Sequence, residues 1–242
     1  MLNLYKKRGE TPLQRITRFR TEKPEFAKEI LSYAGRLDPL AEGVLPVLVG
    51  EEENKNRKEF LHSDKEYEVD ILLGVETDTG DVMGLVQKIA EVSKSITEKI
   101  IDSLGKCIGK FAQEYPTYSS VSISRKNRKS THPVLPKEVE IYTIDFLGKV
   151  QYSATDLLRF VSESVQSVSG DFRQGKIMKV WEEILDGKDT FVFPVLKIKV
   201  SCSSGVYMRL LASRIASVCA IPALVLTIKR TKAGNMSIEQ SM

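Results

Sequence analysis

A short loop near the N-terminus holds the best candidate for a catalytic acid. Asp38 lies within Ala34-Gly-Arg-Leu-Asp-Pro-Leu-Ala-Glu-Gly43, between two glycines and directly before a proline. An aspartate in this setting commonly hydrogen-bonds the nearby backbone and only shapes a turn. From the spacing alone we favour that structural role. A catalytic role would require an ionised carboxylate that a cation holds in place.

Arg209 is the candidate for that cation. It is expected in the first turn of a helix from about Val206 to Val218, directly after the turn-forming Cys202-Ser-Ser-Gly205. The helix dipole disfavours a positive charge there by about 0.3–1 kcal/mol. A nearby carboxylate would offset this cost and would itself be favoured in its charged form. The alternative is an arginine solvated by water, and the sequence alone does not choose between the two.

Tyr67 is the third residue of interest. The segment Lys65–Leu73 alternates between apolar and polar residues and ends at Gly74, which predicts a half-buried strand with Tyr67 on its apolar face. Most tyrosines in such a position belong to the core. The alternative is a ring at the rim of the sheet, where stacking of a flipped base would contribute about 1–3 kcal/mol. The next segment, Gly74–Gly84, is interpreted as a polar loop fixed by its Asp and Thr side chains.

Helices and strands together are expected to position these residues. Helical patterns cover Thr11–Tyr33 with a break near Pro24, Lys94–Ile108, and Ala154–Leu185 with a break near Gly170. Strand patterns cover Val139–Leu147 and Leu196–Cys202, and Leu45–Val49 is a short apolar element. The mixture indicates an α/β or α+β fold. The order and direction of the strands do not follow from this pattern.

Length and composition exclude several classes of protein. A chain of 242 residues suffices for one large domain or two small ones. It has no apolar run of the roughly 20 residues that span a bilayer and no apolar secretory signal, so we expect a cytoplasmic protein without membrane contact. Three dispersed cysteines and two histidines supply neither a familiar Cys/His zinc cluster nor a disulfide framework. A metal held purely by carboxylates is not excluded by this count.

Basic residues gather in three places, and the formal net charge is +4. The clusters are the segment Lys6–Lys23, the group Arg125, Lys126, Arg128 and Lys129, and the group Lys229, Arg230 and Lys232. Such clusters bind phosphates through counterion release. Each cluster alone could equally be a solvated face. Three in one chain favour a polyanionic partner.

Six segments spread over nearly the whole chain carry further motifs. They are Gly35–Gly43, Lys65–Tyr67, Leu73–Thr79, Gln113 with Pro116–Ser119, Cys202–Arg209 and Leu226–Gly234. In this order they resemble the G-x-L-D-P-x-A-x-G catalytic loop, the K-x-Y strand start, and the L-G-x-x-T-D-T, Q-x-P-x-Y-S, C-S-x-G-x-Y-I-R and L-x-R-x-x-x-G segments of the TruB family of tRNA pseudouridine synthases. One such motif would be weak support, whereas six in register reverse the interpretation of Asp38.

The resemblance implies an α+β pseudouridine-synthase fold, in which a central, mainly antiparallel sheet is flanked by helices and crossed by an RNA-binding cleft. It also implies isomerisation of uridine to pseudouridine at position 55 in the T-loop of tRNA, with no cofactor and no metal. The target base would be flipped out, because a stacked base is out of reach. Asp38 would be the catalytic carboxylate, Arg209 would hold it, and Tyr67 would support the uracil and assist the final proton removal. Attack of Asp38 on the ribose C1′ and a glycal-like route both stay open.

Several positions depart from the family pattern. Tyr33 stands where the family usually has a histidine that helps to flip the base, and Arg36 replaces a small residue, as in the G-R-L-D loop of ribosomal-RNA pseudouridine synthases. We expect both residues to bind substrate. The RNA-gripping thumb is short, and we expect its basic residues to bind RNA, namely Arg125, Lys126, Arg128 and Lys129. Residues 151–192 are expected to form a helical insertion in one catalytic domain, 1–242, that lacks a C-terminal PUA domain.

Two alternatives to this function are kept. Arg36 supports a pseudouridine synthase that acts on ribosomal or other RNA. A non-enzymatic alternative is a tRNA-binding folding chaperone, which would need none of Asp38, Tyr67 and Arg209. For the leading hypothesis we expect a monomer that binds the T-arm of tRNA. The hypothesis predicts that residues 38, 67 and 209 converge in one basic groove, with the acid touching the guanidinium.

Overall fold

One large sheet organises the molecule, whose computed structural model describes residues 1–116, 118 and 135–242. In this part of the chain nine strands pair in the order β1-β3-β10-β4-β9-β8-β7, with β2 on β3 and β11 on β10. All pairings are antiparallel except that of β3 with β10. The strands are β1 (Leu2–Lys6), β2 (Leu31–Tyr33), β3 (Ala41–Val49), β4 (Lys65–Leu73), β7 (Gly109–Gln113), β8 (Lys137–Ser153), β9 (Val192–Cys202), β10 (Ala223–Ala233) and β11 (Met236–Ser237). A separate pair consists of β5 (Val75–Thr77) and β6 (Val86–Ile89).

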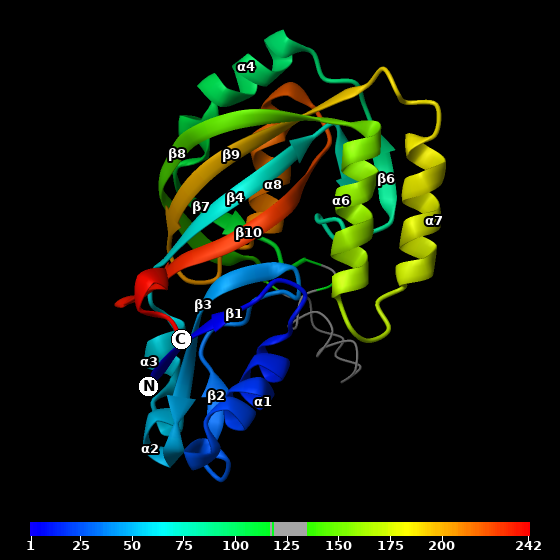
Figure 1. The fold of residues 1–242 in the computed structure, drawn as a ribbon. Helices are drawn as coiled ribbons and strands as arrows, with labels where there is room; N and C mark the ends of the chain where they lie inside the picture. Colours follow the sequence, from blue (N-terminus) through cyan, green and yellow to red (C-terminus); the bar gives the residue numbers. More distant parts are fainter. Residues whose placement is uncertain (117, 119–134) are drawn as a thin grey trace.

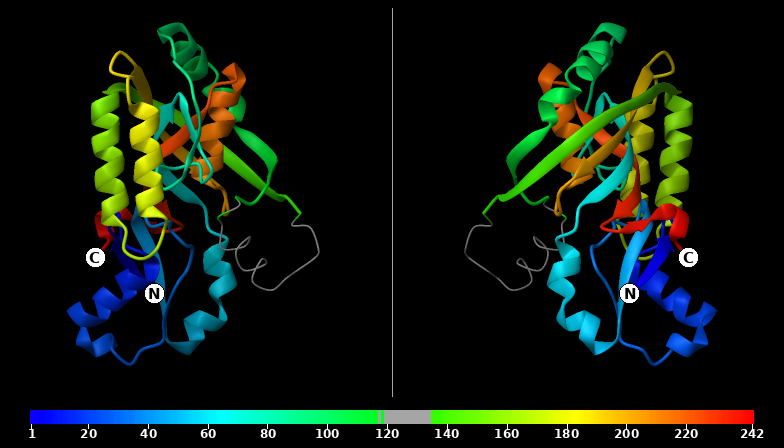
Figure 2. Two further views of the ribbon diagram at one scale, coloured as in Figure 1. Left: turned by 90° about the vertical axis from the view of Figure 1, so that its right-hand side faces the viewer. Right: turned by 90° about the vertical axis from the view of Figure 1, so that its left-hand side faces the viewer.

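Helices cover both faces of this sheet, as Figures 1 and 2 show. They are α1 (Pro12–Glu22), α2 (Gly50–Lys55), α3 (Arg57–Leu61), α4 (Lys94–Asp102), α6 (Ala154–Ser167), α7 (Gln174–Leu185) and α8 (Met208–Ala216). Short 3-10 turns lie at Pro24–Phe26, Leu104–Cys107, Ser217–Cys219 and Ile238–Gln240. None of the helices in the described ranges has the length and apolarity that a membrane crossing requires.

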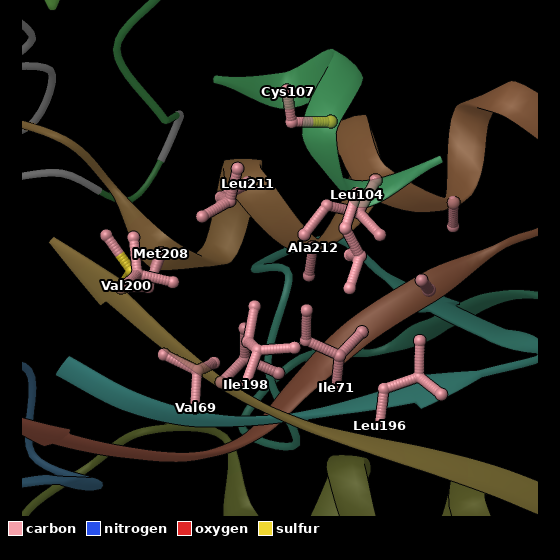
Figure 3. Packing of buried hydrophobic residues seen from close by; sticks show 14 of the residues in the cluster. Val69, Ile71, Leu104, Cys107, Leu196, Ile198, Val200, Met208, Leu211 and Ala212 are labelled. Carbon is pink, nitrogen blue, oxygen red and sulfur yellow. The ribbon is translucent and has the colours of Figure 1, made fainter. Parts of the chain in front are cut away.

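The first core lies between the sheet and helices α8 and α4. Strands expose alternate side chains to opposite faces, so Val69 and Ile71 of β4 and Ile198 of β9 all face α8. Met208 and Leu211 of α8 pack onto them (Figure 3). This packing fixes the beginning of α8 directly over β4 and β9.

A second core forms on the opposite face, under α6 and α7. The intervening residues of the same strands point there, including Leu72 and Val195. They contact Leu157 of α6 and Trp181 of α7, which are fully buried. The helix pair is therefore packed onto the sheet through its apolar side. A smaller third core joins α1 to β1 and β3.

The segments predicted from the sequence mostly form the expected type of structure. The strand Lys65–Leu73 has the predicted bounds, and α1 begins at a capping box of Thr11 and Gln14 before the break at Pro24. The segment predicted to be helical up to Tyr33 ends instead in β2, because this stretch pairs with β3. The helix predicted to reach Ile108 ends at Asp102, and the 3-10 turn Leu104–Cys107 follows it. Gly105 lies in this turn, and glycine disfavours continuation of an α-helix.

Candidate active site

A pocket of about 530 Å³ lies where the loop before β3 meets β4, β10 and the start of α8. Its lining includes all five residues that the sequence placed at the catalytic centre and within the described chain: Tyr33, Arg36, Asp38, Tyr67 and Arg209. Residues from distant parts of the chain thus share one cavity. The four basic residues from Arg125 to Lys129 lie outside the described residues.

A glycine and a buried lysine shape the Asp38 loop. Gly43 has a φ of 106°, and a Cβ atom there would lie 2.2 Å from the backbone oxygen of Arg230, so only glycine allows the close parallel approach of β3 to β10. The Nζ of Lys6 donates hydrogen bonds to the carbonyl oxygens of Pro39, at 3.1 Å, and Ala41, at 2.5 Å. Burial lowers the pKa of Lys6 to about 8. The loop is therefore held from beneath by β1 and from the side by β10.

Arg209 contacts the carboxylate of Asp38. Its Nε atom lies 2.9 Å from Oδ2 of Asp38, and a second acid, Asp81, lies 3.8 Å from the same nitrogen. Its NH1 donates a 2.8 Å hydrogen bond to the carbonyl oxygen of Thr79. The side chain is only 4% exposed. Burial opposes its charge, but Asp38 and Asp81 outweigh burial and raise the pKa of Arg209.

Asp81 is a part of this site that sequence reasoning missed. Burial raises the pKa of its carboxyl group, and Arg209 opposes that effect. Its Oδ1 atom accepts hydrogen bonds from the hydroxyl of Thr79, at 2.7 Å, and from the backbone N–H of Met83, at 3.0 Å. The polar segment Gly74–Gly84 was interpreted only as a loop, and the signal that could have marked Asp81 is the run of acids and threonines within it.

Tyr67 lies both in the core and at the wall of the pocket. The residue is 9% exposed and packs within the first core, yet it lines the cavity that contains Asp38. Burial raises the pKa of its hydroxyl group, and the nearby Arg230 opposes that effect. The two interpretations of Tyr67, as a core residue and as a base-contacting residue, therefore do not exclude each other.

Arg230 corrects the interpretation of the third basic cluster as a surface that binds phosphate. The residue is 1% exposed and lines the floor of the pocket. Its Nε donates to the carbonyl oxygen of Val44 at 2.8 Å, and its NH2 donates to that of Gly35 at 3.1 Å. Arg230 therefore holds the Asp38 loop on both sides of Asp38. Arg230 lies in the motif segment Leu226–Gly234, but this structural role depends on the pairing of β10 with β3, which the motif does not specify.

The first basic cluster is also partly internal. Lys6 and Arg15 are buried. Arg18 pairs with Glu10 at 2.9 Å and with Glu22 at 2.6 Å. Much of this positive charge is therefore committed within the protein, which weakens the expectation of a phosphate-binding surface along Lys6–Lys23.

The remaining pocket lining is rich in cations. Arg36 is exposed at the pocket, and the guanidinium of Arg57 lies 5.8 Å from the ring centroid of Tyr33. Lys65 is buried, and burial lowers its pKa to about 8. Among the described residues that line the pocket, Asp38 supplies the only carboxylate. One acid surrounded by cations suits a polyanionic ligand that brings a neutral reacting group to the acid.

Within the described ranges, no group of three or more His, Cys, Asp or Glu side chains could hold a metal ion. The groups in contact with one another at the centre of the pocket are the Asp38 carboxylate and the Arg209 guanidinium, and the Tyr67 side chain lines the same cavity.

Comparison with known proteins defines the class. The model of the TruB family pseudouridylate synthase (N terminal domain) matches residues 23–170, and the chain belongs to this family. Curated relatives include tRNA pseudouridine synthase B of Clostridium tetani, 27% identical over 88% of this chain and 61% of the relative. The same enzyme of Francisella philomiragia is 28% identical over 90% of this chain and 60% of the relative. The chain thus spans about three fifths of the length of these two relatives.

Solved structures agree on the fold. The chain superposes on a structure described as a Cbf5-Nop10-Gar1 complex with a TM-score of 0.59, at 18% identity, over 98% of this chain and 49% of that chain. A structure of an H/ACA RNP bound to a substrate RNA containing 2'-deoxyuridine gives 0.56 at 17% identity, over 98% and 48%. The α+β pseudouridine-synthase fold expected from the motifs is confirmed.

Proposed function

We propose that this protein is a tRNA pseudouridine synthase that isomerises uridine 55 in the T-loop, with Asp38 as the catalytic carboxylate. The observation that carries the proposal is the contact of Asp38 with Arg209 inside a cation-lined pocket. Membership of the TruB family and relatives named tRNA pseudouridine synthase B support it.

The geometry supports a role for each part of the pocket. The target uridine is flipped out of the T-loop into the cavity, because its reacting atoms are inaccessible in a stack. Asp38 either attacks the ribose C1′ or removes a proton to give a glycal-like intermediate, and the bond from C1′ to N1 breaks. The freed uracil turns and forms a bond from C5 to C1′. On the first route the bond between Asp38 and C1′ breaks as this bond forms, and on the second Asp38 returns the proton that it removed from the ribose. C5 then loses its proton, and N1 gains one. Arg209 holds Asp38, while Tyr67 supports the ring and assists the loss of the C5 proton.

Two side chains at the mouth of the pocket are proposed to contact the RNA next to the flipped base. Tyr33 lies half-buried on β2 with the Arg57 guanidinium against its ring, and Arg36 is exposed beside Asp38. An aromatic ring offers stacking, and an arginine offers a charge to a phosphate. We propose that the protein acts as a monomer in the cytoplasm, where tRNA is available, and that its chemistry needs no metal or cofactor.

The decisive experiment incubates the protein with an unmodified tRNA transcript and maps pseudouridine by carbodiimide-dependent reverse-transcription stops. The expected result is one stop in the T-loop at position 55. Asp38→Asn keeps the size and polarity of the side chain, so it should bind tRNA normally and give no stop. A wild-type protein that binds tRNA but leaves every uridine unmodified would refute the proposal.

A second candidate is a pseudouridine synthase for ribosomal or other RNA, which the exposed Arg36 at the pocket favours. Mapping of cellular RNA from a deletion strain separates the two. Loss of pseudouridine from tRNA position 55 supports the first candidate, and loss from ribosomal RNA alone supports the second.

The basic residues from Arg125 to Lys129 are proposed to grip the RNA backbone. Neutralising all four with glutamine should weaken tRNA binding and reduce the dependence of the binding constant on salt, because each lost phosphate contact lowers that slope by about one. Filter binding at several salt concentrations measures both. An unchanged affinity at low and moderate salt would rule out this role.

A further inference from the structure

We infer that the α6–α7 helix pair belongs to the framework of the active site, with Arg173, directly before α7, positioning the loop that holds Arg209 against Asp38. The inference rests on the proposed function and extends it to residues 151–192, the segment expected to be an insertion. None of the motifs recognised in the sequence includes Arg173.

The first step is a two-point contact between Arg173 and the loop after β5. Its NH1 donates to Oδ2 of Asp78 at 2.9 Å, and its NH2 donates to Oδ1 of the same carboxylate at 3.4 Å. The hydroxyl of Tyr118 lies 3.3 Å from both partners, and the guanidinium lies 4.9 Å from the ring centroid of Tyr118. Contacts on two sides fix the direction of the Arg173 side chain.

The second step leads from Asp78 to the catalytic pair. Asp78 also accepts a 2.8 Å hydrogen bond from the backbone N–H of Leu85, which closes the loop. The next residue, Thr79, accepts the 2.8 Å hydrogen bond from Arg209. A Cβ atom at Gly80 would lie 3.2 Å from Arg209. A displacement of Asp78 would therefore move the carbonyl group that orients Arg209.

The backbone of Arg173 supports a role for its side chain. Its φ is 66°, and only one other non-glycine residue in the described chain, Ala220, has a positive φ. An L-residue adopts this conformation at a cost, whereas glycine adopts it freely. Such strain is often found at functional positions. Here an arginine occupies the strained position, and its guanidinium binds Asp78.

The helix pair gives Arg173 a rigid support. Leu157 and Trp181 are fully buried against the sheet, and α6 and α7 lie side by side on one face in Figures 1 and 2. In the second half of α6, the guanidinium of Arg8 lies 4.7 Å from the ring centroid of Phe160 and donates to Ser164 at 2.7 Å. The pair is thus tied both to the sheet and to the N-terminal segment that supports the Asp38 loop.

The test compares Arg173→Gly, Arg173→Lys and Asp78→Asn with the wild-type protein on tRNA transcript. Arg173→Gly removes the contact and relieves the backbone, so it should fold at least as stably. Its kcat should fall by roughly tenfold to a hundredfold, as when a group that orients a catalytic residue is lost, while KM stays unchanged. Arg173→Lys should recover part of kcat, and the Arg173→Gly/Asp78→Asn double variant should be no worse than the poorer single variant.

Arg159→Ala is the matched control, because this arginine lies on α6 and pairs with Asp156 but is 70% exposed. It should leave kcat and KM unchanged. An unchanged kcat for Arg173→Gly, or a change in KM alone, would overturn the inference, since a purely structural or RNA-contacting residue would behave in that way.

A second measurement does not depend on activity. The NMR signal of the Arg209 Nε–H group should shift or broaden in Arg173→Gly and should not change in Arg159→Ala. An unchanged signal in Arg173→Gly would overturn the inference even for an inactive protein. An inactive wild-type protein with the expected NMR change would refute the proposed function and leave the positioning role standing.

Discussion

Arg209 lies between two carboxylates whose surroundings differ. Asp38 is 35% exposed and points into the pocket, and within the described residues Arg209 is its only ion-pair partner. Asp81 is 15% exposed and accepts hydrogen bonds from Thr79 and Met83. A carboxylate whose oxygens are committed to neighbours suits a supporting role, whereas an exposed one can reach a substrate. Arg209 can therefore pair both with Asp38, which is proposed to react, and with Asp81, which is proposed to hold Arg209 in position.

The proposed difference between the two acids is tested most directly by neutralising each acid separately. Asp38→Asn should lower kcat by on the order of 10⁴-fold or more, as for loss of a nucleophile or base. Asp81→Asn should lower it by only about 10–100-fold, because it loosens Arg209 without removing the reacting group. Single-turnover assays on tRNA give both values. Equal losses, or a larger loss for Asp81→Asn, would reverse the assigned roles.

Removing the shared cation tests what each acid contributes to stability. Arg209→Met should lower the free energy of unfolding by about 3–5 kcal/mol, because it leaves a buried charge without its partner. Most of that cost should arise at Asp81, so the Arg209→Met/Asp81→Asn double variant should regain part of it. Urea unfolding measures the difference. Arg36→Met serves as the exposed control, expected within about 0.5 kcal/mol of wild type, and a full cost that persists in the double variant would contradict this account.

The supports of the two acids, Lys6 beneath the Asp38 loop and Asp81 beside Arg209, should make the stability of the protein change with pH in opposite directions. The folded pKa of Lys6, under the Asp38 loop, is lowered from 10.5 to about 8, so between these values the unfolded chain binds more protons and stability rises with pH. Between pH 8 and 10 the rise should be about 2 kcal/mol, and Lys6→Met should lack it.

Asp81 predicts the opposite slope at acidic pH. Its pKa in the folded protein is raised above the ordinary value of 3.8, so the folded protein binds more protons than the unfolded chain as the pH rises from that value. The free energy of unfolding should therefore fall as the pH rises through this range. Urea titrations of wild type, Lys6→Met and Asp81→Asn provide the slopes, and a Lys6→Met protein with the wild-type alkaline slope would exclude this origin.

The sequence predicted the residues of the site better than their supports. Asp38, Tyr67 and Arg209 belong to local motifs whose residue types suit catalysis, and the structure brings them together. Lys6 and Arg230 were counted among basic clusters that could bind phosphate or be solvated, and Arg230 also fell in the motif segment Leu226–Gly234. Neither pattern contains information on burial. Their roles follow from the pairing of β1 and β10 with β3, which no local pattern specifies.

The same limit explains the elements that were missed. The strand Lys65–Leu73 alternates clearly because one face is apolar and the other polar. By contrast, the first four residues of β10 are apolar and buried on both faces, and its second half carries Lys229, Arg230 and Lys232, so neither half shows an alternation. The segment at 154–185 was predicted as helix, and its contact with the loop after β5, through Asp78, was not. That contact depends on a single arginine in the turn before α7.

The parallel pairing of β3 with β10 has a consequence for folding of the chain during its synthesis on the ribosome. Arg230 fastens Val44 and Gly35 across separations of 186 and 195 residues. Contacts between such distant residues form late, since the intervening chain must be ordered first. A nascent chain whose β10 is still inside the ribosome lacks Arg230 beside the Asp38 loop, so the pocket can form only after β10 has emerged.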